Sequence, residues 1–163
     1  PLRQDFSVAL AGMGGFFVIC AIFLWACALV GYDLKAHRLP NFLTLPAAAC
    51  ALGWAFQHPN TTEILSAASL WPILYLVQIW SAALWHRLCG RPHAPGIGGG
   101  DIKLAIPLAI MAAAAGGVFA VLLAAGTASL LSLLIAMLRN RGYVAHGPAM
   151  ILATGMVSIL LVE

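Results

Sequence analysis

Charge is scarce in this sequence: charged residues make up 8% of the 163 residues, and only five residues are acidic. Soluble domains carry roughly 25% charged residues, so this composition excludes a soluble protein. Hydrophobic residues make up 63% of the chain, and its mean hydropathy is +0.98. No polar stretch is long enough to form a soluble domain. We therefore expect residues 1–163 to form a single membrane-embedded domain within a lipid bilayer.

The sequence also lacks the patterns that bind nucleic acids or metals. Its formal net charge is +3, but the cations are scattered between apolar runs, so we expect no nucleic-acid partner. None of the four cysteines forms a C-x-x-C pair, and the spacing of the histidines matches no compact zinc site. We expect no metal and no other cofactor. Four histidines lie in polar segments and are expected to be solvated loop residues: His37, His86, His93 and His146.

The apolar runs predict an all-α, polytopic membrane protein with six transmembrane helices. A helical span needs about 20 apolar residues, and the charge-free run Leu104–Leu138 is too long for one helix. Its natural break is at Gly116 and Gly117, because paired glycines interrupt a helix. The predicted spans are Val8–Val30, Phe42–Phe56, Ile64–Trp85, Ile102–Ala115, Val118–Leu138 and Ala149–Val162.

The distribution of the cations predicts the orientation of these spans. Seven of the eight Lys and Arg residues fall in loops on one side, and only Arg3 lies on the other. The seven are Lys35, Arg38, Arg87, Arg91, Lys103, Arg139 and Arg141. By the positive-inside rule, that side is cytoplasmic and both termini lie outside.

Two acids lie on the cytoplasmic face, Asp33 at the end of the first span and Asp101 at the start of the fourth. Asp101 alone has a structural explanation, because an Asp that follows glycines is a favoured helix N-cap. Asp33 has no such explanation, because an acid at a helix C-terminus opposes the helix dipole. An ionisable residue at membrane depth is a functional hypothesis by default.

A pair of carboxyl groups on one membrane face suggests an aspartyl protease. In that chemistry one carboxylate acts as general base on a water molecule, while the other, protonated, polarises the peptide carbonyl. Two such groups titrate as a unit, so the sequence leaves open whether Asp33 or Asp101 holds the proton.

Residues near Asp101 admit two interpretations each. Gly98 and Gly100, with the glycine between them, either let a substrate strand approach the backbone without Cβ clashes or form a flexible connector. Lys103 either holds the neighbouring acid ionised or extends its amine to the membrane interface. Asn41, after Pro40, is expected to cap the second span.

These motifs resemble those of a known family. Asp33 is followed by the segment 38–41, Arg-Leu-Pro-Asn, and Asp101 lies in the segment 98–104, Gly-Gly-Gly-Asp-Ile-Lys-Leu. Together they resemble the type IV prepilin peptidases, or leader peptidases, a six-span group of GxGD-type aspartyl proteases that work at the cytoplasmic membrane face. The resemblance covers essentially the whole chain in span order. The segment 146–148, His-Gly-Pro, is similar to the late Phe-Gly-Pro segment of that family, with His in place of Phe.

The resemblance implies that Asp33 and Asp101 are the catalytic pair, with Gly98, Gly100 and Lys103 binding the substrate or supporting the site. It implies a pilin-like precursor as substrate, cut after a Gly at the cytoplasmic boundary of the plasma (inner) membrane. Many bacterial members also methylate the new N-terminus and carry an insertion with paired C-x-x-C motifs. This sequence has no such pairs, so it resembles the minimal, peptidase-only form.

Three alternatives stay open at this point. The Tyr-Asp at 32–33 with the Gly-x-Gly-Asp at 98–101 also fits a presenilin-like or signal-peptide-peptidase-like protease, although those proteins have more spans and deeper acids. A small transporter could use the two carboxylates as a proton relay, but Gln78 is the only strongly polar residue expected in mid-span. A purely structural subunit would tolerate Asp-to-Asn changes at both positions. The sequence does not indicate the oligomeric state.

Overall fold

The computed structural model describes residues 2–36, 39–89, 98–139 and 144–161, and all regular structure in these residues is helical. The helices are α1 (Leu2–Ala36), α2 (Asn41–Gln57), α3 (Thr61–Cys89), α4 (Gly99–Arg139) and α5 (Gly147–Leu161). A lipid environment offers no water to the backbone, so its amides and carbonyls must pair within helices. The prediction of an all-α protein is confirmed.

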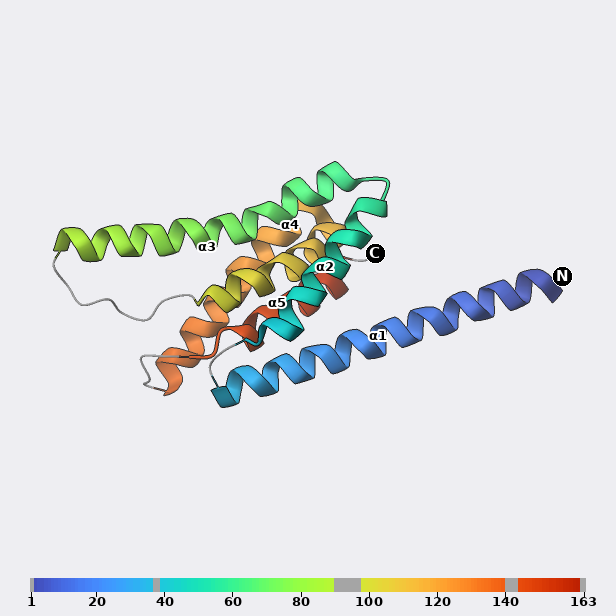
Figure 1. Ribbon diagram of the computed structural model, residues 1–163, viewed down its shortest axis with the longest axis horizontal. Helices are drawn as coiled ribbons and strands as arrows, with labels where there is room; N and C mark the ends of the chain where they lie inside the picture. Colours follow the sequence, from blue (N-terminus) through green and yellow to red (C-terminus); the bar gives the residue numbers. More distant parts are fainter. Residues whose placement is uncertain (1, 37–38, 90–97, 140–143, 162–163) are drawn as a thin grey trace.

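Helix α4 is a hairpin rather than one straight rod. Its backbone leaves helical geometry at Gly116 (φ −164°, ψ 29°) and Gly117 (φ 60°, ψ −145°). In Figure 1 the first half of α4, in yellow, and the second half, in orange, turn back on each other. The predicted break at this glycine pair is confirmed. The reversal matters for function because it brings the second half of α4 back toward the end of the molecule at which α4 begins.

Gly117 is expected to be required for this reversal. Its φ of 60° with a ψ of −145° is a combination that side-chain-bearing residues rarely adopt, so Gly117→Ala should lower the free energy of unfolding by roughly 1–3 kcal/mol. Gly126→Ala is the matched control in the same helix, because a Cβ there has nothing within 4 Å and Ala favours a helix by about 1 kcal/mol over Gly. Denaturant unfolding in mixed micelles measures both. Equal stabilities of the two variants would contradict the assigned backbone conformation.

The predicted spans correspond closely to these helices. The first five predicted spans each lie inside a helix, and the sixth begins within α5 and ends at Val162, outside the described residues. In the described part of the chain, three helical segments are long and apolar enough to cross a membrane: Gly15–Ala36, Thr61–Cys89 and Gly99–Leu138. Because α2 and α5 are short, the count of six crossings stays a prediction.

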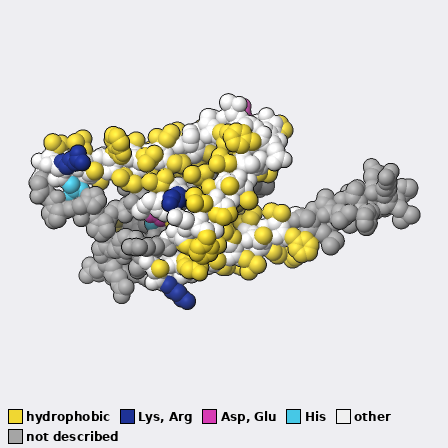
Figure 2. Space-filling view, in the orientation of Figure 1, with side chains coloured by type: hydrophobic (Ala, Val, Ile, Leu, Met, Phe, Trp, Pro, Cys, Tyr) yellow, Lys and Arg dark blue, Asp and Glu magenta, His cyan; other side chains and the backbone are white. Residues whose placement is uncertain are grey.

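Helix α4 is the centre of the bundle and packs against α2, α3 and α5. Alanines line its buried face and let the neighbouring helices approach closely, as small residues do between membrane helices. The fully buried alanines of α4 are Ala105, Ala109, Ala112, Ala120, Ala124 and Ala128. Large hydrophobic side chains cover much of the outer surface in Figure 2, as expected for a surface that faces lipid.

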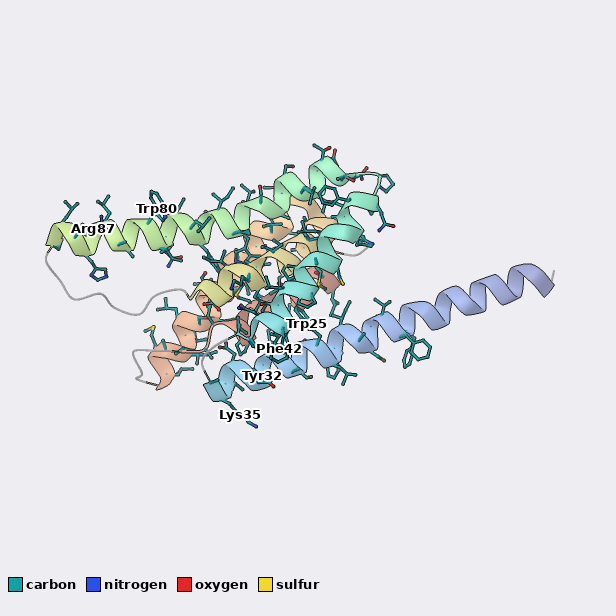
Figure 3. All side chains as sticks on the ribbon, viewed as in Figure 1. Trp25, Tyr32, Lys35, Phe42, Trp80 and Arg87 are labelled. Carbon is teal, nitrogen blue, oxygen red and sulfur yellow. The ribbon has the colours of Figure 1, made fainter. Side chains whose placement is uncertain are left out.

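Helix α1 stands apart from the bundle along most of its length (Figure 1) and is attached near its C-terminal end. The Trp25 indole N–H donates a hydrogen bond to the Leu43 carbonyl in α2, at 2.9 Å. One turn of α1 before its end, the Tyr32 ring meets Phe42 edge-on, with ring centroids 5.8 Å apart. Figure 3 shows these side chains between the two helices. They hold the last turns of α1, which carry Asp33, against the rest of the protein.

Candidate functional site

Asp33 lies in the last turns of α1 but is bound by the first residue of α5. Its side chain is 4% exposed, and its Oδ2 atom accepts a hydrogen bond from the Gly147 backbone N–H at 3.0 Å. The first amides of a helix have no partner within the helix, and the positive end of the helix dipole favours a negative group there. The N-terminus of α5 therefore accounts for an acid that the dipole of its own helix disfavours.

Gly147 leaves no room for a side chain beside this carboxylate. A Cβ atom at Gly147 would lie 2.8 Å from Asp33 Oδ2 and 3.4 Å from Leu39 Cδ2. The absence of a side chain thus allows the close approach between the backbone of α5 and Asp33.

Asp101 is held in a comparable way at the start of α4. Its Oδ2 atom accepts a hydrogen bond from the Gly98 N–H at 3.0 Å, and its own N–H donates to the Gly98 carbonyl at 3.0 Å. Asp101 is the third residue of the helix, and its carboxylate reaches back to the residue that precedes the helix, as in one half of a capping box. The alternative explanation, that Asp101 is simply the N-cap, does not hold, because α4 begins two residues earlier, at Gly99.

Leu39 packs at the point where the two acid-bearing segments meet. Leu39 is 9% exposed, and a Cβ atom at Gly100 would lie 3.0 Å from its Cβ atom. Its Cδ2 atom also lies beside Gly147, the residue that binds Asp33. The carboxyl groups of Asp33 and Asp101 are close enough to interact electrostatically. The structure thus brings together the two acids that the sequence singled out.

The glycines before Asp101 have a packing role in this structure. Gly98 supplies the amide that binds Asp101, and Gly100 makes room for Leu39. Gly100 lies inside α4, and Gly117 is the glycine found with positive φ in the described part of the chain.

Lys103 and Asn41 bind each other. The Lys103 Nζ atom donates a hydrogen bond to Asn41 Oδ1 at 2.8 Å, which joins the first turn of α4 to the start of α2. The prediction that Asn41 caps α2 is wrong: Pro40 occupies the cap position without a side-chain cap bond, and Asn41 is the first helical residue. Neither interpretation of Lys103 included this partner, because nothing local relates two residues that are 62 positions apart.

His146 is not a solvated loop residue, and the prediction for it is wrong. Its Nε2 atom lies 2.6 Å from the Tyr75 hydroxyl of α3, and its Nδ1 atom lies 2.6 Å from the Ser132 hydroxyl of α4. Tyr75 is 3% exposed, so its hydroxyl is held away from solvent. Burial lowers the pKa of the His146 imidazole below its usual value. The sequence analysis did not identify Tyr75 or Ser132, and no local motif marks either residue.

The remaining polar residues add little to the site. His37 and His93 lie outside the described residues. The prediction of a solvated loop residue is wrong for His86, which lies half-buried in α3, and Gln78 is exposed on α3 rather than buried in mid-span. Besides Asp33, the buried polar residues in the described part of the chain are Thr44 and Thr154, and each donates its hydroxyl to a carbonyl one turn earlier. The described residues include no group of three or more His, Cys, Asp or Glu side chains that could hold a metal ion.

Comparison with known sequences identifies the family. The sequence model of the type IV leader peptidase family matches residues 18–137, which is most of the chain and includes Asp33 and Asp101. Comparisons with curated proteins and with solved structures gave no match. The matched residues contain both segments on which the sequence resemblance depends. In the structure Leu39, from the first segment, packs against Gly100 of the second and lies beside Gly147, which binds Asp33. The chain therefore belongs to the type IV leader peptidase family.

Proposed function

We propose that this protein is a prepilin-type leader peptidase in which Asp33 and Asp101 hydrolyse a peptide bond of a pilin-like precursor. One observation above all supports the proposal: each of the two carboxyl groups accepts a hydrogen bond from a backbone amide at the start of a helix, and Leu39 packs against Gly100 and Gly147 beside them. A water molecule between two such groups can be activated by one while the other polarises the substrate carbonyl.

The reaction needs only these two groups and a water molecule. The ionised carboxylate removes a proton from water, whose oxygen attacks the scissile carbonyl carbon, while the protonated carboxyl gives its proton to the carbonyl oxygen. The resulting tetrahedral intermediate collapses when the first acid passes its new proton to the leaving amine and the C–N bond breaks. The second acid then recovers a proton from the hydroxyl group. Because the pair titrates as a unit, either Asp33 or Asp101 can begin as the base.

The proposed location is the cytoplasmic face of the plasma membrane. Asp33 lies near the C-terminal end of α1 and Asp101 at the start of α4, so both fall on the side to which seven of the eight cations are assigned. Lys35 and Arg87, labelled in Figure 3, lie toward the ends of α1 and α3 on that side. With α4 counted as two spans, six crossings leave both termini outside. We propose no methylation activity, because the sequence contains no C-x-x-C pair.

The transporter alternative requires a polar route across the whole membrane. A proton relay needs ionisable or strongly polar groups spaced across the membrane. Among the described residues, the buried side chains with polar groups include, besides Asp33, two threonines whose hydroxyls bind carbonyls one turn earlier. The buried Tyr75 hydroxyl is bonded to His146, next to the residue that binds Asp33. Peptide hydrolysis at one membrane face accounts better for where the polar groups lie.

A cleavage assay tests the proposed function. The purified protein in liposomes is incubated with a synthetic precursor that has a short basic leader, a Gly and a hydrophobic helix, and the products are identified by mass. We expect a single cut after the Gly. A precursor in which this Gly is replaced by a bulky residue serves as the control and should be cut much more slowly. No product from a correctly folded protein, or cuts scattered along the peptide, would contradict the proposal.

A further inference from the structure

The residue that precedes Gly147 is anchored to two other helices. His146 is the cap position of α5: its carbonyl accepts the N–H of Met150, the first bond of that helix, at 3.1 Å. Its ring reaches away from α5, to Tyr75 of α3 on one nitrogen and to Ser132 of α4 on the other. Both ring nitrogens are thus bonded, which leaves the imidazole no freedom to rotate.

The imidazole of His146 and the hydroxyls of Tyr75 and Ser132 can all form hydrogen bonds at the same time. A neutral imidazole has one nitrogen that donates and one that accepts, and a hydroxyl can do either. Burial lowers the pKa of His146, so the ring is neutral at neutral pH and can use both hydroxyls at once. Residues 144–146, which lead into α5, are not part of a helix. A ring bonded to side chains of two other helices restrains this segment where it enters α5.

The anchored residue adjoins the amide that binds Asp33. Because Gly147 follows His146 directly, the plane of the peptide bond between them sets the direction of the Gly147 N–H. That N–H donates to Asp33 Oδ2 at 3.0 Å. A rotation of the His146 backbone would therefore turn the amide away from the carboxylate.

We propose that His146 is a positioning residue of this peptidase, whose imidazole, held by Tyr75 and Ser132, aims the Gly147 amide at Asp33. The inference rests on the proposed function and adds a residue that lies beyond the family match, which ends at residue 137. Tyr75 and Ser132 are the two anchors of the ring, one in α3 and one in α4. The three side chains thus join both of these helices to the start of α5.

The test removes one hydroxyl group at a time and measures the NMR signal of the Gly147 amide. His146–Gly147 is the only His-Gly pair in the sequence, so labelling His carbonyl carbons and Gly amide nitrogens gives one selective NMR signal for this peptide bond. Tyr75→Phe and Ser132→Ala should each shift the signal and lower kcat about tenfold, with KM changed less than about twofold, because misplacement of a catalytic group slows chemistry. Ser132→Thr keeps a hydroxyl and should retain the wild-type signal and kcat.

Ser129→Ala is the matched control for Ser132→Ala. Ser129 lies one turn earlier in α4 and donates to the Ala125 carbonyl of its own helix, so its loss should change neither readout. A lower kcat without a shift of the Gly147 signal in both variants would overturn the proposal. So would an effect of Tyr75→Phe with none of Ser132→Ala, because Tyr75 would then not act through His146. If even the wild-type protein fails to cut the precursor, the proposed function fails, while the NMR signal still decides whether His146 holds this amide.

Discussion

Cleavage of a pilin-like precursor is expected to fall by about 10²- to 10⁴-fold when either Asp33 or Asp101 is replaced by asparagine, the range that general acid–base catalysis contributes. Asparagine has the shape of aspartate but can neither take up nor release the required proton. Its amide oxygen can still accept the hydrogen bond that Gly147 or Gly98 donates to the carboxylate, so the fold should be retained. Product formation measured by mass, with kcat and KM for each variant, checks this expectation.

Glu63→Gln is the control for both substitutions. Glu63 is an exposed acid in the first turn of α3, and its loss removes one negative charge without touching either aspartate. It should leave cleavage unchanged. The aspartyl mechanism would be wrong if either Asp-to-Asn variant retained wild-type activity. If both were inactive but also unfolded at a much lower temperature than the wild type, Asp33→Glu and Asp101→Glu would separate the effect on the fold from that on the chemistry, because glutamate keeps the titratable group.

The second large effect is expected at Gly147, the middle residue of the His-Gly-Pro segment. Gly147→Ala would place a methyl group 2.8 Å from Asp33 Oδ2, closer than real Cβ contacts allow, so the carboxylate or the start of α5 must move. Displacement of a catalytic group by about 1 Å can cost about 10²-fold in rate, and we expect a loss of that order in kcat. The overpacking itself should destabilise the protein by about 1–3 kcal/mol. Cleavage kinetics and denaturant unfolding measure the two effects separately.

Gly155→Ala is the matched control in the same helix. A Cβ at Gly155 has nothing within 4 Å, so this variant should keep full activity and gain up to about 1 kcal/mol from better helix propensity. Wild-type kcat in Gly147→Ala would show that the position of Asp33 does not depend on the start of α5. It would also remove the physical basis for the role proposed for His146, since that role acts through the Gly147 amide.

The helices could be predicted from sequence because the membrane makes apolar length decisive. In a bilayer each backbone amide must pair inside its own segment, so runs such as Phe42–Phe56 become helices wherever they lie in the fold. The break at Gly116 and Gly117 was also predictable, since paired glycines interrupt a helix, and Gly117 takes a positive φ that residues with a side chain rarely adopt. Short helices were less certain, and for that reason the number of membrane crossings stays a prediction.

The two aspartates could be found because so few charges compete with them. Ionisable groups are costly in a membrane. Two acids on the same predicted face therefore indicate that they act together. Their surroundings were predicted less well. Asn41 was assigned to the cap of α2 from its local pattern, but the observed position one residue into the helix leaves its side chain to bind Lys103.

By itself, then, the sequence determined an all-helical membrane protein with a reversal in α4 and an aspartate at each of two segments that meet. Only the tertiary structure showed which groups hold the aspartate side chains in place. Gly147 binds Asp33 from 114 residues away, and His146 joins three helices. The physical reason is that helix length, turns and membrane side depend on local composition, which a sequence displays directly. A hydrogen bond between distant residues depends on which helix faces pack together, and in a chain so uniformly apolar many faces look alike.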